Sequence, residues 1–268
     1  MCMGCCLDID ENRCAEVRGC TAFAFTCEGK TYYARTNDLP PFLKKISKSI
    51  LYQPKGGYKF LLNTSSFTNG EEGMNEYGLV AAMTFAIPKI TEIKPGLNSV
   101  FLVRYLLEKC RTVDEGISAI QRLPVSSNCN ILIADKTGRM VVVECNPFEK
   151  HVRAPQTNEF GNQFVITVNS LLSPEMEKHK AGEENPFFSK DRYQTAETAL
   201  LRLKERPIET AKAILSGKCG FMCQYVKELN FDTIWATIFN LSDLKVYRAE
   251  GNPKKKSFVS DDRLMSRH

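Results

Sequence analysis

The chain has 268 residues, of which 43% are hydrophobic and 25% charged, and its formal net charge at pH 7 is +5. These values are ordinary for a soluble globular protein and leave room for one large domain or two small ones. The one concentrated basic run, residues 254–256, is better explained by a solvated tail, so we expect no nucleic-acid partner. A run of about 18 apolar residues, the length needed for a transmembrane helix, does not occur, so we expect no membrane span.

The start of the chain mixes cysteine with acidic residues and has no apolar segment of the kind found in signal peptides, so we expect a cytoplasmic protein. The chain has 11 cysteines, and without a secretion signal they favour buried, reduced thiols over a disulfide framework. Cys2-x-x-Cys5-Cys6 and Cys219-x-x-x-Cys223 could each form half of a metal site, but they lack the paired spacing of a zinc site. We therefore expect no metal and no cofactor.

The first third of the chain has the apolar runs and turn residues that are typical of β-strands and hairpins. Residues 21–27 and 30–35 predict a hairpin around a Glu-Gly turn, and a Pro-Pro pair ends its second strand. Two more strands are predicted at 58–62 and 79–85, with a turn at 70–73 between them.

Two helices follow. Residues 98–110 have apolar side chains at helical spacing with Asn98 as the cap, and residues 113–123 form the second helix. The later part of the chain predicts strands at 130–134, 140–144, 164–168, 233–241 and 245–248, and helices at 191–204 and 207–215. Helices therefore segregate from antiparallel hairpins, which favours a single-domain, layered α+β fold over a doubly wound one.

The most informative position is Cys20, which follows Gly19 and opens the first apolar strand. A Gly-Cys bond at this place suggests a protein that cuts its own chain there and exposes Cys20 as a new N-terminus. The free α-amine, with a reference pKa of about 7.7–8.0, could act as the base for the thiol. Such a base matters because the chain has only three histidines, His151, His179 and His268. The alternative is a Gly-Cys turn before a strand, with a thiol that is simply buried.

Seven segments in chain order together resemble one family. They are GCTAF at 19–23, YARTND at 33–38, GMNEYGLVAAMTF at 73–85, NCNILIADKTGRMVVVE at 128–144, VITVNS at 165–170, SKDRY at 189–193 and TIWATIFNL at 233–241. On these segments the chain resembles the N-terminal-nucleophile (Ntn) hydrolases of the choloylglycine hydrolase and penicillin V acylase group. Within that group it is most similar to the acyl-coenzyme A:6-aminopenicillanic acid acyltransferase-like branch. The resemblance implies a four-layer αββα sandwich, with residues 1–19 removed as a propeptide and 20–268 as the catalytic domain.

The resemblance also implies the chemistry, in which a linear amide bond of a small N-acylated substrate is cleaved through a thioester on Cys20. A guanidinium near the thiol would favour the thiolate, with Arg35 as the first candidate and Arg192 as the second. Asp38 would accept hydrogen bonds from the new α-amine and hold it toward the sulfur. In an extended strand Arg35 and Asn37 share one face and Asp38 lies on the other, unless the strand breaks.

Two donors to the oxyanion are implied, the side-chain amide of Asn169 and the backbone N–H near Thr84. One such donor contributes roughly 3–4 kcal/mol in other acyl-transfer enzymes. Three departures from the family pattern concern the substrate. The chain is shorter than a typical bile-salt hydrolase, Asn37 stands where relatives often carry Met or Trp, and Thr84 or Phe85 falls where many carry Asn or Tyr. Relatives are often oligomeric, which leaves a homo-oligomer open.

Two other functional classes compete with this interpretation. One is a Cys-His hydrolase that uses Cys145 with His151 or His179 and does not cut itself, although no third catalytic residue stands at a recognisable spacing. The other is a non-catalytic, cysteine-rich module whose thiols bind a metal or a partner. Within the first class the substrate stays open among bile-salt conjugates, phenoxyacetyl β-lactams, N-acyl homoserine lactones, N-acyl amino acids and peptides. The acceptor of the acyl group, water or another amine, is open as well.

Overall fold

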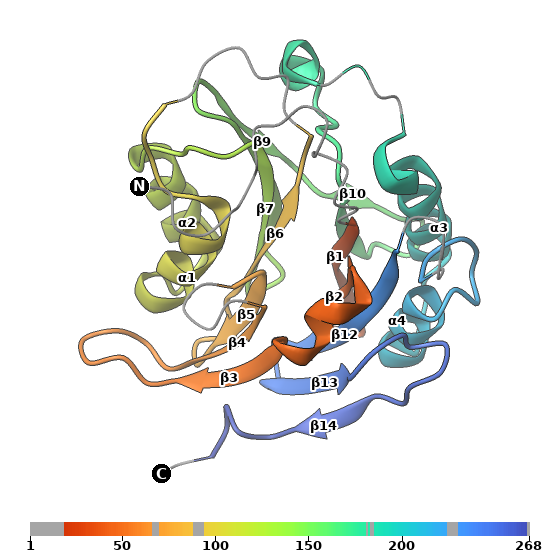
Figure 1. Ribbon diagram of the computed structural model, residues 1–268. Coiled ribbons are helices and arrows are strands. Elements are labelled where there is room, and N and C mark those ends of the chain that lie inside the picture. The colour runs from red at the N-terminus through yellow and green to blue at the C-terminus, as the bar shows by residue number, and fades with distance from the viewer. Residues whose placement is uncertain are drawn as a thin grey trace.

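A computed structural model of the chain describes residues 19–65, 70–87, 94–180, 182, 185–223 and 230–266. Two antiparallel sheets face each other, and helices cover the outer side of each (Figure 1). The first sheet contains, in spatial order, β10 (Gln156–Thr157), β11 (Gln163–Thr167), β1 (Gly19–Cys27), β2 (Lys30–Leu39), β12 (Asp232–Asn240), β13 (Lys245–Ala249) and β14 (Val259–Asp261). The second contains β3 (Lys48–Tyr52), β4 (Phe60–Thr64), β5 (Glu72–Asn75), β6 (Val80–Phe85), β7 (Cys129–Ala134), β8 (Met140–Cys145) and β9 (Lys150–Arg153).

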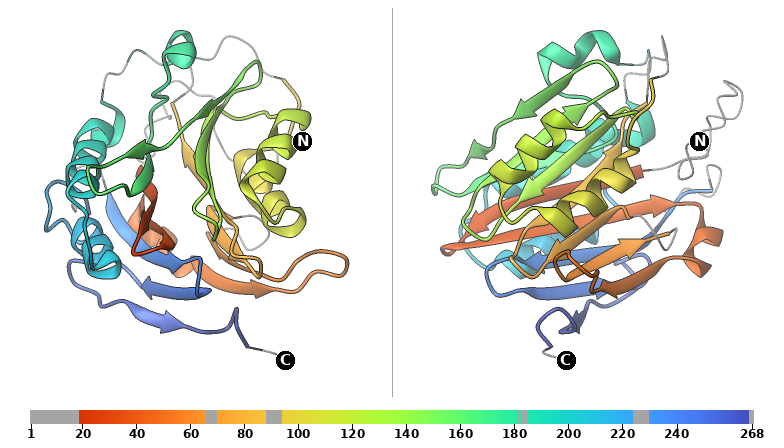
Figure 2. Two further views of the ribbon diagram at one scale, coloured as in Figure 1. Left: turned by 180° about the vertical axis from the view of Figure 1, so that it is seen from behind. Right: turned by 90° about the vertical axis from the view of Figure 1, so that its left-hand side faces the viewer.

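The helices form the two outer layers (Figure 2). α1 (Ser99–Lys109) and α2 (Val113–Arg122) pack on the second sheet, whereas α3 (Ser189–Leu201) and α4 (Pro207–Leu215) pack on the first. Short 3₁₀ turns complete the connections: η1 (Pro41–Lys45), η2 (Pro174–His179) and η3 (Pro186–Phe188). The predicted cap of α1 is confirmed, because the side chain of Asn98 accepts a hydrogen bond from the Val100 N–H at 3.2 Å. The four-layer α+β prediction is confirmed as well.

The core lies in three apolar layers, and the alternation of side chains along each strand assigns residues to them. On β1, Phe23 and Phe25 face the helices, whereas Ala22 and Ala24 face the second sheet. Small side chains on the inner face let the two sheets approach closely. The same alternation fixes which residues near the start of β1 lie between the sheets.

The expected turn at 70–73 is wrong, because Glu72–Asn75 is the buried strand β5 between β4 and β6. Glycine at 73 serves close packing, since an added Cβ would collide with the backbone carbonyl of Leu61 on the neighbouring strand. The hairpin of β1 and β2 is confirmed and extends further than expected, to Gly19 opposite Asp38.

Four further strands were not predicted, and all of them are sheet edges: β3 and β9 in the second sheet, β10 and β14 in the first. Edge strands are short and carry exposed polar residues, so they lack the apolar alternation that reveals a strand in sequence. Within the described residues, every helix is too short or too polar to cross a membrane.

Candidate active site

The pairing of β1 with β2 builds the site around Cys20. Cys20 lies directly opposite Asn37, and its side chain is 5% exposed. By the alternation along the two strands, Cys20, Arg35 and Asn37 face the second sheet. β2 runs unbroken to Leu39, so Asp38 lies on the opposite, helix-covered face. The strand break considered above is therefore not present.

Arg35 is the guanidinium that contacts the Cys20 thiol. Its Nη2 donates to Cys20 Sγ at 2.9 Å, and its Nη1 donates to the carbonyl of Met83 at 2.5 Å. The side chain is fully buried, so the cation is held in one orientation. Burial raises the pKa of the Cys20 thiol, and the charge of Arg35 is the largest opposing effect. The thiol therefore needs a base as well as the nearby cation.

The sequence places Asn37 on the same strand face as Arg35 and marks it as a departure from the family pattern, and in the structure Asn37 contacts the Cys20 thiol. Its Oδ1 accepts hydrogen bonds from Arg35 Nη2 at 2.7 Å and from the Cys20 thiol at 3.3 Å. The Arg35 contact fixes the orientation of the amide, because a guanidinium can only donate. Asn37 Nδ2 is buried and has no acceptor among the described residues. The hairpin register, counted outward from the Glu-Gly turn, is the signal that could have identified this residue.

Asp38 is fully buried beside Gly19, its partner in the strand register. Its carboxylate accepts hydrogen bonds from the hydroxyl groups of Thr233 at 2.5 Å and Thr36 at 3.3 Å. Burial raises the pKa of Asp38 to about 6, against the opposing charge of Arg192. The role expected of Asp38 toward a free α-amine stays a prediction.

Asn169 and Arg192 hold the backbone of Cys20 from the other side. Asn169 Oδ1 accepts hydrogen bonds from the Cys20 backbone N–H and from Arg192 Nη2, each at 2.8 Å. Asn169 Nδ2 donates to the carbonyl of Phe85 at 2.9 Å. Arg192 Nη1 donates to the Cys20 carbonyl at 2.5 Å and to the Thr21 hydroxyl at 2.7 Å. Of the two candidate arginines, Arg35 thus contacts the sulfur, and Arg192 contacts the backbone.

Thr84 lies at the end of β6, next to the segment that carries Asn169. Its hydroxyl donates to the carbonyl of Val168 at 2.7 Å and contacts Thr167 Oγ1 at 2.9 Å. These contacts bring the ends of β6 and β11 together beside Cys20. Donation from the backbone near Thr84 to an oxyanion stays a prediction.

The alternative Cys-His site is not formed. Cys145 is packed in the layer between the second sheet and its helices, and its thiol contacts the carbonyl of Val143 at 3.6 Å. His151 pairs in register with Glu144, the neighbour of Cys145, so its side chain lies on the opposite face of the sheet. The Nε2 atom of His179 lies 3.3 Å from a carboxylate oxygen of Glu149.

Among the described cysteines none is joined to another by a disulfide, and Cys219 is exposed whereas Cys223 is buried. Three or more His, Cys, Asp or Glu side chains do not gather into a metal-binding group anywhere in the described ranges. Cys2, Cys5 and Cys6, together with the proposed propeptide up to residue 18 and His268, lie outside these ranges.

The chain aligns with solved structures of Ntn hydrolases. A mutant conjugated bile acid hydrolase from Clostridium perfringens aligns with a TM-score of 0.65 at 14% identity, over 92% of this chain and 93% of that chain. Penicillin V acylase from Agrobacterium tumefaciens aligns with a TM-score of 0.57 at 16% identity, over 86% and 82%. The Caenorhabditis elegans orthologue of N-acylethanolamine-hydrolyzing acid amidase aligns with a TM-score of 0.58 at 16% identity, over 83% and 93%. At these identities the likeness establishes the Ntn-hydrolase fold.

Residues 26–255 match the family model of the acyl-coenzyme A:6-aminopenicillanic acid acyl-transferases, and the chain belongs to this family. The family resemblance seen in the sequence is thereby confirmed. No curated protein matches the chain by sequence. The matched range begins after Cys20, so the role of Cys20 rests on the geometry described above.

Proposed function

We propose that this protein is a self-processing cysteine amidase or acyltransferase that cleaves a linear amide bond of a small N-acylated substrate through a thioester on Cys20. One observation carries the proposal. At the start of β1, in a member of this family, the Cys20 thiol accepts a hydrogen bond from Arg35 while the Cys20 nitrogen donates to Asn169.

The first step is the cut of the chain itself. Cys20 Sγ attacks the Gly19 carbonyl carbon, the bond to the Cys20 nitrogen breaks, and that nitrogen takes up a proton to become the α-amine. Water then hydrolyses the thioester and leaves a carboxylate on Gly19 and a free thiol on Cys20. Glycine suits this position for reasons of space, since an added Cβ would lie 2.5 Å from Phe231 Cζ. The backbone of Gly19 itself has ordinary strand geometry, so the position does not require the conformational freedom of glycine.

In the mature enzyme the α-amine accepts the thiol proton as Sγ attacks the substrate carbonyl. The amide nitrogen leaves with a proton from the same amine, and the acyl group stays on Cys20 until water or a second amine removes it. Asn169 Nδ2 carries two hydrogens, one bound to the Phe85 carbonyl and the other available for the oxyanion. Asp38 and Asn169 Oδ1 would together orient the α-amine.

The substrate class follows from what the structural relatives have in common. They are named for conjugated bile acids, penicillin V and N-acylethanolamines, each of which joins an acyl group to an amine. We infer the same N-acyl amide linkage in the substrate of this protein. Hydrolysis and acyl transfer differ only in the acceptor that attacks the thioester.

Intact mass and amine release from a panel of N-acyl substrates test the proposal. Wild-type protein is expected to lose residues 1–19 and to release amine, whereas Cys20→Ala stays full length and inactive. Cys27→Ala is the matched control, because Cys27 is a buried thiol on the same strand that faces the helices. Full activity in a protein that retains Met1, or in Cys20→Ala, would refute the proposal.

A further inference from the structure

Three polar side chains form a row on the inner face of the second sheet. Thr84 on β6 pairs in register with Asn130 on β7, and Asn130 pairs with Glu144 on β8. All three are fully buried between the two sheets. Burying a polar group costs free energy unless a hydrogen bond satisfies it. The hydrogen-bond partners of these three side chains therefore indicate their structural role.

The row holds one segment of chain, residues 168–173, which we call the Asn169 segment. Thr84 Oγ1 and Asn130 Nδ2 both donate to the Val168 carbonyl, at 2.7 and 2.9 Å, and Asn130 Nδ2 also lies 3.2 Å from the Ser170 carbonyl. These contacts fix the backbone on both sides of Asn169.

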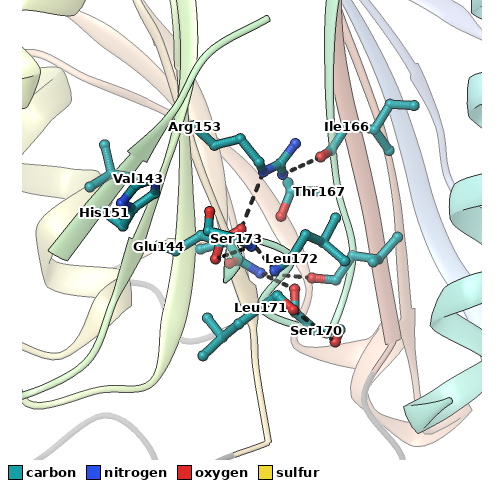
Figure 3. Close-up of polar contacts among 12 residues, drawn as sticks. Val143, Glu144, His151, Arg153, Ile166, Thr167, Ser170, Leu171, Leu172 and Ser173 are labelled. Carbon is teal, nitrogen blue, oxygen red and sulfur yellow. Dashed lines mark hydrogen bonds and ion pairs between the residues drawn. The ribbon is translucent and has the colours of Figure 1, made fainter. Parts of the chain in front are cut away.

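Glu144 fixes the other end of the Asn169 segment (Figure 3). Its Oε1 accepts the Leu172 N–H at 2.9 Å, and its Oε2 accepts the Ser173 N–H at 3.0 Å. Each carboxylate oxygen accepts one of the two backbone groups, whereas in glutamine one of these oxygens would be replaced by an NH₂ group that can only donate. The segment therefore has a fixed point after Asn169 that depends on the two oxygens of one side chain.

Arg153 compensates the buried charge of Glu144. Its Nε lies 3.2 Å from Glu144 Oε1, and its Nη2 donates to the Ile166 carbonyl on β11 at 2.6 Å (Figure 3). The ion pair joins β9 to β8 within the second sheet, and the hydrogen bond to Ile166 ties Arg153 to β11 of the first sheet, directly before the Asn169 segment.

We propose that Glu144 is a positioning residue, which holds Asn169 against Cys20 by fixing the backbone of the Asn169 segment. The inference rests on the proposed function, in which Asn169 contacts the nitrogen of Cys20 and the oxyanion. Asn169 makes three contacts of 2.8 to 2.9 Å with Cys20, Arg192 and Phe85. A displacement of about 1 Å at such a group can lower a rate by about 10²-fold.

The test compares Glu144→Ala and Glu144→Gln with variants of a matched carboxylate. Asp135 is also buried and also accepts two backbone N–H groups, those of Val113 and Thr137 at 2.9 Å, but it lies at the far end of β7. Steady-state kinetics with an N-acyl substrate gives kcat and KM, thermal unfolding gives stability, and hydrogen exchange gives the protection of the Leu172 and Ser173 amides.

We expect Glu144→Ala to lower kcat by about 10- to 100-fold with KM within about threefold, and to lose protection at Leu172 and Ser173. Glu144→Gln keeps one acceptor oxygen, so its kcat should lie between those of Glu144→Ala and the wild type. Asp135→Ala and Asp135→Asn should lose stability without this loss of kcat. If Glu144→Ala does not fold, Glu144→Gln and Arg153→Met are used for the same comparison. Arg153→Met removes the compensating cation and its hydrogen bond to the Ile166 carbonyl, but it leaves both Glu144 oxygens in place.

A second arm asks whether Glu144 acts through Asn169. In an Asn169→Ala background, Glu144→Gln should lower kcat no further, whereas independent sites would multiply their effects. Equal kcat losses in Glu144 and Asp135 variants of equal stability would overturn the positioning role and leave the proposed function standing. Near-wild-type kcat in Asn169→Ala would instead overturn the role of Asn169 in the proposed function, and the positioning role with it.

Discussion

Asn37 connects the Cys20 thiol to the Arg35 guanidinium, and its two hydrogen bonds have opposite effects on the thiol. Its Oδ1 holds Arg35 against the sulfur, but it also accepts from the Cys20 thiol. A hydrogen bond donated by the neutral thiol opposes ionisation. The position therefore tunes the reactivity of Cys20, and a Met or Trp at the equivalent place would tune it differently.

Asn37→Leu is expected to lower the pKa of the Cys20 thiol, because the thiol loses the acceptor of its proton while Arg35 remains. Below that pKa, each unit of decrease makes alkylation by iodoacetamide about tenfold faster at fixed pH. Mass spectrometry of the Cys20 peptide across pH measures the midpoint, with Cys27 in the same digest as the internal control. A midpoint that rises in the variant would contradict this account of Asn37.

The buried carboxyl of Asp38 makes stability depend on pH. Its pKa in the folded chain is raised from 3.8 to about 6, so the folded state binds the proton more tightly than the unfolded state. The protonated Asp38 carboxyl therefore stabilises the folded state fully below pH 3.8, and this stabilisation is lost as the pH rises through about 6. Two pKa units correspond to roughly 3 kcal/mol.

Asp38→Asn should remove this dependence. The comparison uses Cys20→Ala as the parent, because it would have no free α-amine. The Tm of the Asp38→Asn variant minus the Tm of this parent should increase from pH 4 to pH 6.5. Thermal unfolding in a pH series measures it, and the parent protein supplies the control for all other titrating groups. A constant difference across that range would show that Asp38 keeps an ordinary pKa.

At the scale of elements, the start of β1 is closed by Phe231, which comes just before β12. Gly19→Ala is expected to slow self-cleavage, because the new methyl group would lie 2.5 Å from the Phe231 ring and displace the Gly19 carbonyl from Cys20. Phe231→Leu removes the colliding ring atoms and should restore cleavage in the double variant. The rate is read from intact mass against time, and the single variant Phe231→Leu is the control. Cleavage of Gly19→Ala at the wild-type rate would contradict the steric account.

The sequence predicts those helices and strands in which apolar side chains recur at helical or strand spacing within one segment of chain. The β1–β2 hairpin, the capped helix α1 and the inner strands β6, β7 and β8 belong to this class. The edge strands and β5 do not, since edge strands are half exposed and the glycine of β5 imitates a turn. Cys20, both arginines, Asp38 and Asn169 could be proposed as site residues through the family resemblance. Glu144 could not, because its proposed role arises from the register between β6 and the distant β7–β8 hairpin and from contacts with the Asn169 segment.

Across the whole molecule, the site draws side chains from the ends of both sheets and from α3, and the two histidines of the described chain lie elsewhere. His151 Nε2 lies 3.4 Å from Glu175, and His179 Nε2 lies 3.3 Å from Glu149. His151→Gln and His179→Gln should therefore keep activity within about tenfold of wild type, well short of the 10²–10⁴-fold typical of a lost general base. Steady-state kinetics on folded variants checks this. A loss beyond about a thousandfold in either would favour a histidine-dependent mechanism.

The hydrogen bond from the Cys20 nitrogen to Asn169 exists while that nitrogen is still part of a peptide bond. Under the proposed function, cutting the chain would convert the nitrogen from an amide into an amine that already has its hydrogen-bond acceptor in place. The proposed cut is intramolecular and irreversible, so its rate would not depend on protein concentration. A freshly synthesised population would consequently gain specific activity with age, and dilution would neither delay nor reverse that gain.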